Sequence, residues 1–232
     1  MSGPPLVAVA HGSRDPAATQ VTRALLAEVR RQRPGLDVVE SYLDHAEPEL
    51  SQVLEGRQRH SGPAVVVPLL LGAAYHSGVD IPAAIAATGG RAVQADVLGP
   101  DPLLLSALER RLAEAGIDPG DPGTAVVLAA AGSTDTHAVD GVRTLAAGWR
   151  TRGWWAVEPA FASAASPSVE DAVASLRAQG APRVAVATYL LFPGLFADQL
   201  AGAAADVTSA PLGDAPEVAR LVLARYDAAV TP

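Results

Sequence analysis

The chain has 232 residues, of which 49% are apolar and 18% charged, with a formal net charge of −8. This length and composition predict one large or two smaller folded domains without long disordered segments. Cysteine and lysine are both absent, all 17 basic residues being arginine, which excludes disulfides, thiolate chemistry, Schiff bases and a lysine-bearing phosphate loop. The negative charge disfavours nucleic acid as a partner.

Neither targeting nor membrane segments are predicted. The first residues lack a basic segment followed by an apolar stretch and a cleavage site, so no secretion signal is expected. Every apolar run is interrupted well before the roughly 18 residues that a membrane span needs. We therefore expect a cytoplasmic protein with no membrane partner.

Two stretches of the chain follow one plan. The segments 7–15 and 127–135 are each an apolar run of strand length that ends in Gly-Ser-x-Asp, 120 residues apart. The first carries a histidine, His11, where the second has Ala131. Further matches, such as Tyr42 with Phe161 and Leu98 with Leu212, indicate an internal duplication.

In chain order, strand-like and helix-like segments alternate. The first half predicts strand 6–10, helix 16–32, strand 37–43, helix 48–59, strand 64–71, helix 79–85, strand 92–98 and helix 102–115. The second predicts strand 124–130, helix 135–151, strand 154–161, helix 168–179, strand 183–191, and helices 196–204 and 216–229. This order is typical of α/β proteins, with a mainly parallel sheet of about four strands flanked by helices in each half.

Residues 116–124 are dense in glycine and proline and are interpreted as a linker. The expected domains are therefore 1–117, which carries the candidate histidines, and 124–232, which lacks them. A duplicated chain of this kind is expected to be a monomer with internal pseudo-symmetry.

Three strand ends in the first half carry candidate site residues. His11 follows the first strand, Asp44 and His45 the second, and Tyr75 and His76 the third. Because the carboxyl ends of parallel strands meet at one sheet edge, His11, Asp44 and His76 are predicted to lie together. Two imidazoles and a carboxylate suit Fe²⁺, Co²⁺ or Ni²⁺. His45, His60 and His137 are expected to be solvent-exposed residues without a role.

The Gly-Ser pairs that begin both repeats have two interpretations. Glycine can simply permit the sharp turn into a helix. Alternatively, the helix starts after Ser13 and Ser133 bind an anionic group, helped by Arg14 and Thr134. Ser13 is not expected to be a hydrolytic nucleophile, because the Gly-x-Ser-x-Gly pattern is missing.

Several ordered motifs resemble one family, and the resemblance covers essentially the whole chain. They are His11-Gly-Ser-Arg14, Tyr42-Leu-Asp-His-Ala-Glu-Pro48, Val67-Pro-Leu-Leu-Leu71 running on to Tyr75-His76, Val79-Asp-Ile-Pro82, Ala160-Phe-Ala-Ser-Ala164 and Tyr189-Leu-Leu-Phe-Pro-Gly194. They are similar to the sirohydrochlorin chelatases, type II chelatases of siroheme and cobalamin biosynthesis, in their long two-domain form. The resemblance implies a lyase that inserts a divalent metal into a sirohydrochlorin-type tetrapyrrole, with the active site in the cleft between the two domains.

What the resemblance implies for single residues is specific. His11 and His76 would bind the metal and remove protons, and Asp44 stands where the family commonly has glutamate, with Glu47 as a substitute ligand. A neutral imidazole can bind a metal through its free nitrogen. Its ordinary pKa near 6.5 also lets it accept a proton at neutral pH. No organic cofactor is expected, since the metal is a substrate.

The tetrapyrrole is expected to contact residues of both halves. Ser13, Arg14, Tyr75, Ser133 and Thr134 are the predicted substrate-binding residues. Apolar surface for the macrocycle, or part of the core, is expected from Tyr189, Phe192, Leu195 and Phe196. Two rival functions stay open, a phosphotransferase or phosphatase with His11 as nucleophile, and a metal or tetrapyrrole carrier without turnover.

Overall fold

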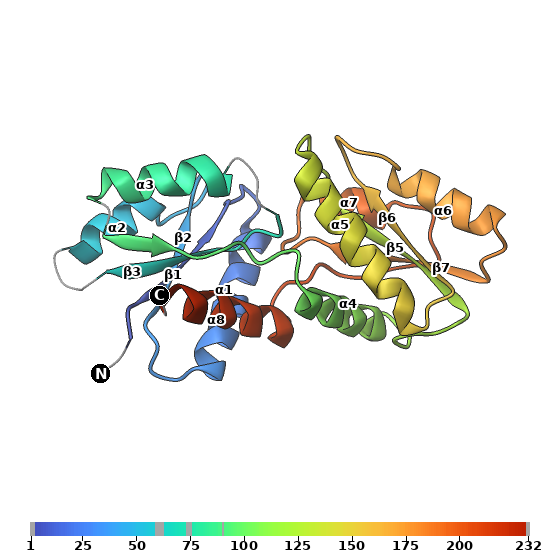
Figure 1. The fold of residues 1–232 in the computed structure, drawn as a ribbon, viewed down its shortest axis with the longest axis horizontal. Helices are drawn as coiled ribbons and strands as arrows, with labels where there is room; N and C mark the ends of the chain where they lie inside the picture. Colours follow the sequence, from blue (N-terminus) through green and yellow to red (C-terminus); the bar gives the residue numbers. More distant parts are fainter. Residues whose placement is uncertain (1–2, 59–62, 73–75, 90, 231–232) are drawn as a thin grey trace. The chain divides into compact units, whose positions relative to one another are not determined.

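The computed structural model describes residues 3–58, 63–72, 76–89 and 91–230, without the side chains of residues 58, 76 and 77. The chain forms two compact units, one made of Met1–Gly99 with Asp214–Pro232 and the other of Pro100–Gly213. Each unit contains a four-stranded parallel sheet with helices on both faces (Figure 1). This confirms the predicted α/β class with duplicated domains.

The first unit has the strand order β2-β1-β3-β4. Its strands are β1 (Leu6–Ala10), β2 (Val38–Tyr42), β3 (Ala64–Pro68) and β4 (Ala92–Gln94). Its helices are α1 (Pro16–Gln32), α2 (Leu50–Gln58), the π-helix η1 (His76–Asp80), α3 (Ile81–Ala87) and α8 (Pro216–Val230).

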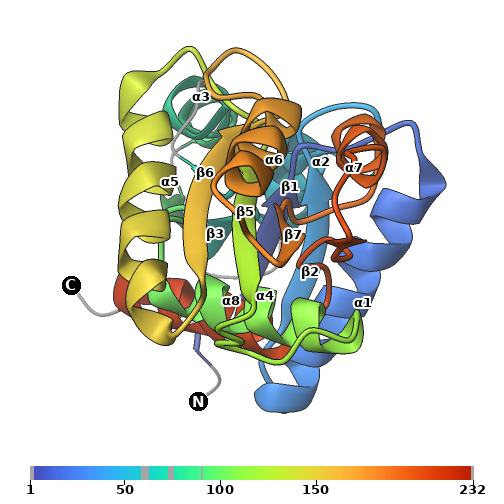
Figure 2. The ribbon, with the colours of Figure 1, turned by 90° about the vertical axis from the view of Figure 1, so that its right-hand side faces the viewer.

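The second unit repeats this plan with the order β6-β5-β7-β8, and Figure 2 shows β5 between β6 and β7. Its strands are β5 (Thr124–Ala130), β6 (Ala156–Phe161), β7 (Arg183–Tyr189) and β8 (Val207–Thr208). Its helices are α4 (Pro102–Glu114), α5 (Thr136–Trp149), the 3₁₀ turn η2 (Arg150–Arg152), α6 (Val169–Ala178) and α7 (Leu195–Ala201).

The central strands are apolar throughout because both faces of each sheet are covered. Every residue of β1 and of β5 is buried. Successive side chains of a strand point to opposite faces. Val7 and Val9 therefore pack against α2 and α3, as part of a core cluster that includes Leu50, Leu54 and Ile81.

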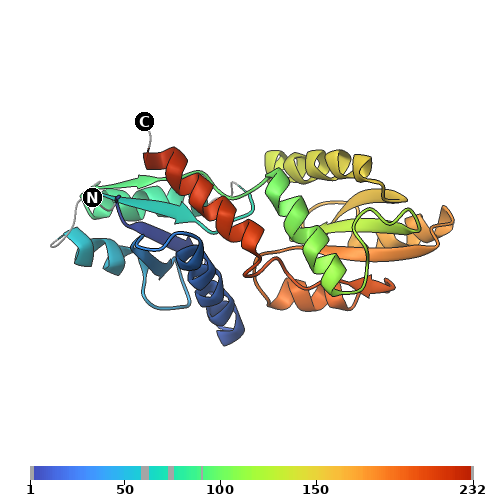
Figure 3. The ribbon, with the colours of Figure 1, turned by 90° about the horizontal axis from the view of Figure 1, so that it is seen from below.

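The last helix of each repeat covers the sheet of the other repeat. Helix α8 packs beside α1 and against β3, while α4 packs against β7 and α5. Figure 3 shows α8, in red, with the strands of the first unit and α4, in green, with those of the second. Arg225 of α8 donates hydrogen bonds to the carbonyls of Val97 and Leu98, at 2.8 and 3.0 Å. Arg111 of α4 donates twice to the carbonyl of Leu212, at 3.2 and 2.9 Å.

The chain therefore passes between units at 99/100 and 213/214, which differs from the expected domains 1–117 and 124–232. Residues 116–124, interpreted as a linker, lie inside the second unit. There Asp121 accepts hydrogen bonds from the Gly123 amide and the Thr124 hydroxyl, at 2.9 and 2.6 Å. An amphipathic helix can cover either of two similar sheets, and the sequence pattern does not say which.

Most predicted elements are present with shifted ends. Two differ in kind: the helix expected at 79–85 begins earlier as the π-helix η1, and β8 was not predicted because it has only two residues. No helix within the described ranges is long and apolar enough to cross a membrane.

Candidate active site

The loops after β1 and β2 are held together through the backbone. The amide of Asp44 donates a hydrogen bond to the carbonyl of His11, at 3.0 Å. Gly12 has a φ of +94°, and a Cβ at this position would lie 1.7 Å from the carbonyl oxygen of Asp44. Glycine is therefore required both for the left-handed backbone and for the close approach, which together bring His11 and Asp44 to one sheet edge.

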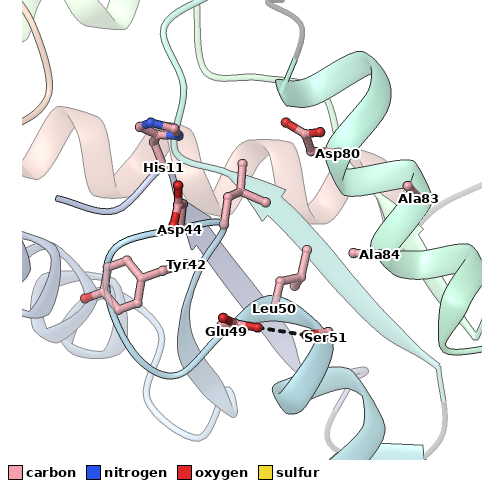
Figure 4. A pocket seen from close by; sticks show the side chains of 10 residues that line it. His11, Tyr42, Asp44, Glu49, Leu50, Ser51, Asp80, Ala83 and Ala84 are labelled. Carbon is pink, nitrogen blue, oxygen red and sulfur yellow. Dashed lines mark hydrogen bonds between the residues drawn. The ribbon is translucent and has the colours of Figure 1, made fainter.

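These two residues line a pocket of about 340 Å³ in the first unit (Figure 4). The other lining residues come from the end of β2, the start of α2, the end of η1 and α3; they are Tyr42, Leu43, Glu49, Leu50, Ser51, Asp80, Ala83 and Ala84. The wall combines an imidazole and carboxylates with apolar side chains. That mixture can hold a cation beside an apolar ligand.

His45 lies closer to the candidate site than expected. Its side chain is partly exposed, at 37%, as predicted, but its ring centroid is 6.2 Å from that of His11. Its Nδ1 lies 3.3 Å from Oδ1 of Asp44, which also accepts a 2.7 Å hydrogen bond from the His45 amide. The ring and the amide of His45 therefore both contact the Asp44 carboxylate, and the ring also lies near that of His11.

The predicted substrate-binding residues of the first unit follow directly on His11. The hydroxyl of Ser13 accepts a hydrogen bond from the amide of Asp15, at 3.0 Å, and Asp15 in turn accepts from the amide of Ala17. This capping carboxylate occupies part of the helix start that was expected to bind an anion. Arg14 is exposed, and the described part of the chain gives its guanidinium no ion-pair partner.

Other predicted site residues lie elsewhere. Tyr75 is outside the described residues, and for His76 only the backbone is described, at the start of η1. Glu47 is exposed, precedes a cis peptide bond with Pro48, and is not among the pocket-lining residues. Among the side chains that the structure describes, no three from His, Cys, Asp and Glu are placed to hold a metal ion together.

The pocket includes acidic residues that the sequence did not single out. Asp80 faces His11 from η1 on the other side of the pocket, and Glu49 lies at the far end, beside Ser51 (Figure 4). Asp80 belongs to the Val-Asp-Ile-Pro stretch of the family resemblance, so a signal existed for it. Glu49 had none, because its place depends on how the loop after β2 turns into α2.

Tyr42 lines the pocket without offering a base. Burial raises the pKa of its phenol, and the nearby Glu40 carboxylate raises it further. Its hydroxyl points away from His11 (Figure 4). The groups in the pocket wall that can accept a proton at neutral pH are therefore imidazole and carboxylates.

The second unit has the same backbone with different side chains. The amide of Ser163 donates to the carbonyl of Ala131 at 3.0 Å, and a Cβ on Gly132, whose φ is +91°, would lie 1.8 Å from the Ser163 carbonyl oxygen. This geometry confirms the predicted correspondence of His11 with Ala131, and it pairs Asp44 with Ser163. The Ser133 hydroxyl accepts from the Asp135 amide at 3.0 Å, and Thr134 is exposed.

The four apolar candidates of the second unit differ in their exposure. Tyr189 is buried, and burial together with the Asp101 carboxylate raises the pKa of its phenol, so it belongs to the core. Phe192 is half-buried. Leu195 and Phe196 at the start of α7 are 81% and 39% exposed, and they can offer apolar surface to a ligand.

Comparison with known proteins shows the family to which this chain belongs. The model of the CbiX family matches residues 5–115 and 125–229, and so covers both halves. The chain belongs to the CbiX family. This confirms the resemblance to sirohydrochlorin chelatases in their two-domain form.

Individual relatives agree with this placement. The sirohydrochlorin cobaltochelatase of Priestia megaterium is 28% identical over an alignment of 206 residues, which covers 83% of this chain and 65% of that protein. The chain thus spans just under two thirds of that relative. SirB from Bacillus subtilis, solved with Fe³⁺, has the same fold with a TM-score of 0.84 at 23% identity, over 100% of this chain and 96% of that one.

A second SirB structure, from Bacillus subtilis subspecies spizizenii in complex with cobalt, superposes with a TM-score of 0.79 at 22% identity. It covers 100% of this chain and 97% of that one. The two-unit fold of this CbiX-family chain is therefore found complete in proteins that have been solved with metals.

Proposed function

We propose that this chain is a sirohydrochlorin chelatase, a lyase that inserts Fe²⁺ or Co²⁺ into the tetrapyrrole, with Ni²⁺ as a third candidate. The observation that carries the proposal is the CbiX match across both halves. The cobaltochelatase relative and the metals in the two SirB structures support it. The cytoplasm stays the expected location.

The proposed metal ligands are His11, His76 and Asp44. Support comes from the backbone hydrogen bond that holds His11 and Asp44 at one edge of the sheet, and from the pocket that both line. An imidazole nitrogen and a carboxylate oxygen both suit a divalent first-row metal. Glu47 is a weaker candidate than Asp44, because it is not among the pocket-lining residues.

Insertion requires two pyrrole protons to leave while nitrogens replace the water ligands of the metal. His11 and His76 are the proposed acceptors, since a neutral imidazole can take a proton at neutral pH. Each proton then passes to water as the imidazole is regenerated. Glu49 and Asp80 keep the pocket negative, which favours the incoming cation.

The tetrapyrrole carries carboxylates at its edge, which an acidic protein would repel. Arg14 is proposed to bind one of them, because it is exposed next to His11. The hydroxyls of Ser13, Ser133 and Thr134, together with Tyr75, are proposed as further contacts. Leu195 and Phe196 would cover part of the macrocycle.

The direct test mixes purified protein with sirohydrochlorin and Co²⁺ or Fe²⁺ and follows the absorption change of the macrocycle. We expect catalytic turnover well above the rate without protein. A change limited to one equivalent of protein would indicate a carrier instead. Release of phosphate from phosphorylated compounds, with no insertion, would favour the histidine phosphatase alternative.

A further inference from the structure

Asp80 differs from the other aspartates that stand before helices in this chain. Asp15, Asp101 and Asp135 have extended backbones, and each accepts a 2.9 Å hydrogen bond from the backbone amide two residues later. Asp80 is itself helical, with φ −70° and ψ −44°, because η1 runs directly into α3. Its side chain makes no capping hydrogen bond, so capping does not explain an aspartate at this position.

The Asp80 carboxylate lies in the pocket, opposite His11. It projects from the end of η1, whereas His11 and Asp44 lie on the opposite wall (Figure 4). The described lining contains three carboxylates, those of Asp44, Glu49 and Asp80, and no arginine. Asp80 is therefore the carboxylate that faces His11 across the space through which a metal ion would approach.

The segment that carries Asp80 lies in a connection that is longer in the first unit than in the second. The Leu98 amide bonds to the Leu70 carbonyl, and the Leu212 amide bonds to the Leu190 carbonyl, at 2.9 and 2.8 Å. The offset between the repeats falls from 120 at Leu70 and Leu190 to 114 at Leu98 and Leu212, so the first unit has six more residues in between. Helix η1 lies in that longer connection, and π-helical turns are frequent at functional sites.

We propose that Asp80 is the first protein ligand of the incoming divalent metal, which it passes across the pocket to His11; this proposal rests on the chelatase function. A carboxylate oxygen readily replaces a water ligand on such an ion. His11, Asp44 and Asp80 are not placed, among the described side chains, to hold one ion together. The ion therefore exchanges the Asp80 oxygen for the imidazole nitrogen as it moves toward the macrocycle.

The test compares D80N with D80E in the insertion assay, with Co²⁺ as the varied substrate. The neutral amide of D80N should raise KM for Co²⁺ about tenfold and leave kcat within about twofold. D80E, which keeps the carboxylate, should recover most of the wild-type KM. Glu55 of α2 is exposed and not among the pocket-lining residues, so E55Q is the matched control and should keep the wild-type KM.

Thermal unfolding of the variants separates a damaged fold from a lost ligand, and D80E carries the test if D80N unfolds early. A wild-type KM for Co²⁺ in D80N, a fall in kcat alone, or a D80E variant no better than D80N would overturn the role of Asp80. The wild-type protein tests the parent proposal separately. If it inserts no metal, the chelatase function itself fails.

Discussion

The loops after β1 and β5 share a backbone and differ in chemistry. Gly12 and Gly132 have nearly the same positive φ, +94° and +91°, and each permits the same close approach of the neighbouring loop. The aligned positions carry His11 and Asp44 in the first unit but Ala131 and Ser163 in the second. The backbone of these loops is therefore duplicated, whereas the imidazole and the carboxylate are present in the first unit only.

The connections after β3 and β7 extend this difference. The first unit has the longer connection, with the π-helix η1 and Asp80, whereas the second leads through Gly194 into α7 with the exposed Leu195. One unit thus offers groups for a cation and the other offers apolar surface. This difference agrees with the proposal that the first unit binds the metal and the second contributes apolar surface for the macrocycle.

The largest expected effect comes from removing the histidines of the first unit. His11→Ala and His76→Ala should each lower kcat/KM for metal insertion by about 100-fold or more, since each removes a proposed metal ligand and proton acceptor. His11 is exposed, so unfolding in urea should change little for His11→Ala. The matched control is His137→Ala in the exposed first turn of α5, which should keep wild-type activity.

The two glycine turns give the next largest effect. Gly12→Ala and Gly132→Ala should each destabilise the protein by about 2 kcal/mol or more, measured by urea unfolding, because the new Cβ collides with a carbonyl oxygen. Only Gly12→Ala should also reduce insertion strongly, by displacing Asp44. Gly148→Ala in α5 meets nothing within 4 Å and should stabilise the protein by about 0.5–1 kcal/mol. Equal activity losses in the two turn variants would contradict the assignment of the ligands to the first unit.

The last helix of each repeat, α4 or α8, allows the same stability test to be made in both units. Arg225→Met leaves the Val97 and Leu98 carbonyls without their guanidinium donor, and Arg111→Met does the same to the Leu212 carbonyl. Each should lower the free energy of unfolding by about 1–2 kcal/mol. Arg177→Met, which removes an ion pair whose side chains are 46% and 47% exposed, should cost less than about 0.5 kcal/mol. If Arg177→Met lowered the free energy of unfolding more than the other two variants, these carbonyl contacts would not be what holds α4 and α8 in place.

The smallest effects are expected from replacing Arg14 and Thr134, which occupy matching positions in the two repeats. Arg14→Ala should raise KM for sirohydrochlorin about tenfold and leave KM for Co²⁺ unchanged, because it removes a charged hydrogen bond to a carboxylate. Thr134→Ala should raise KM for sirohydrochlorin by about two- to threefold. Loss of turnover at unchanged KM in Arg14→Ala would contradict its binding role.

Local patterns in the sequence predicted much of this molecule. The apolar runs predicted the buried parallel strands, and the repeated Gly-Ser-x-Asp predicted the matching turns, because both depend on interactions within one repeat. The meeting of His11 with Asp44 followed from the rule that parallel strands end at one edge.

The features that the sequence did not predict depend on a choice between similar long-range contacts. Helices α4 and α8 cover equivalent faces of two similar sheets, so their amphipathic patterns fit either unit. The position of Glu49 in the pocket depends on the turn into α2. His45 lies near His11 in a loop where its own φ is +60°, and no pattern in the sequence predicts that backbone conformation. Asp80 was visible as part of a motif, but its direction depends on the π-helical turn before it.

Titration of the protein with Co²⁺ by calorimetry tests most directly the claim that a single unit carries the metal chemistry. We predict one site per chain in the wild-type protein, and loss of that site in His11→Ala while the protein stays folded. Two equivalent sites per chain, or an undisturbed site in His11→Ala, would contradict the claim that the first unit alone binds the metal.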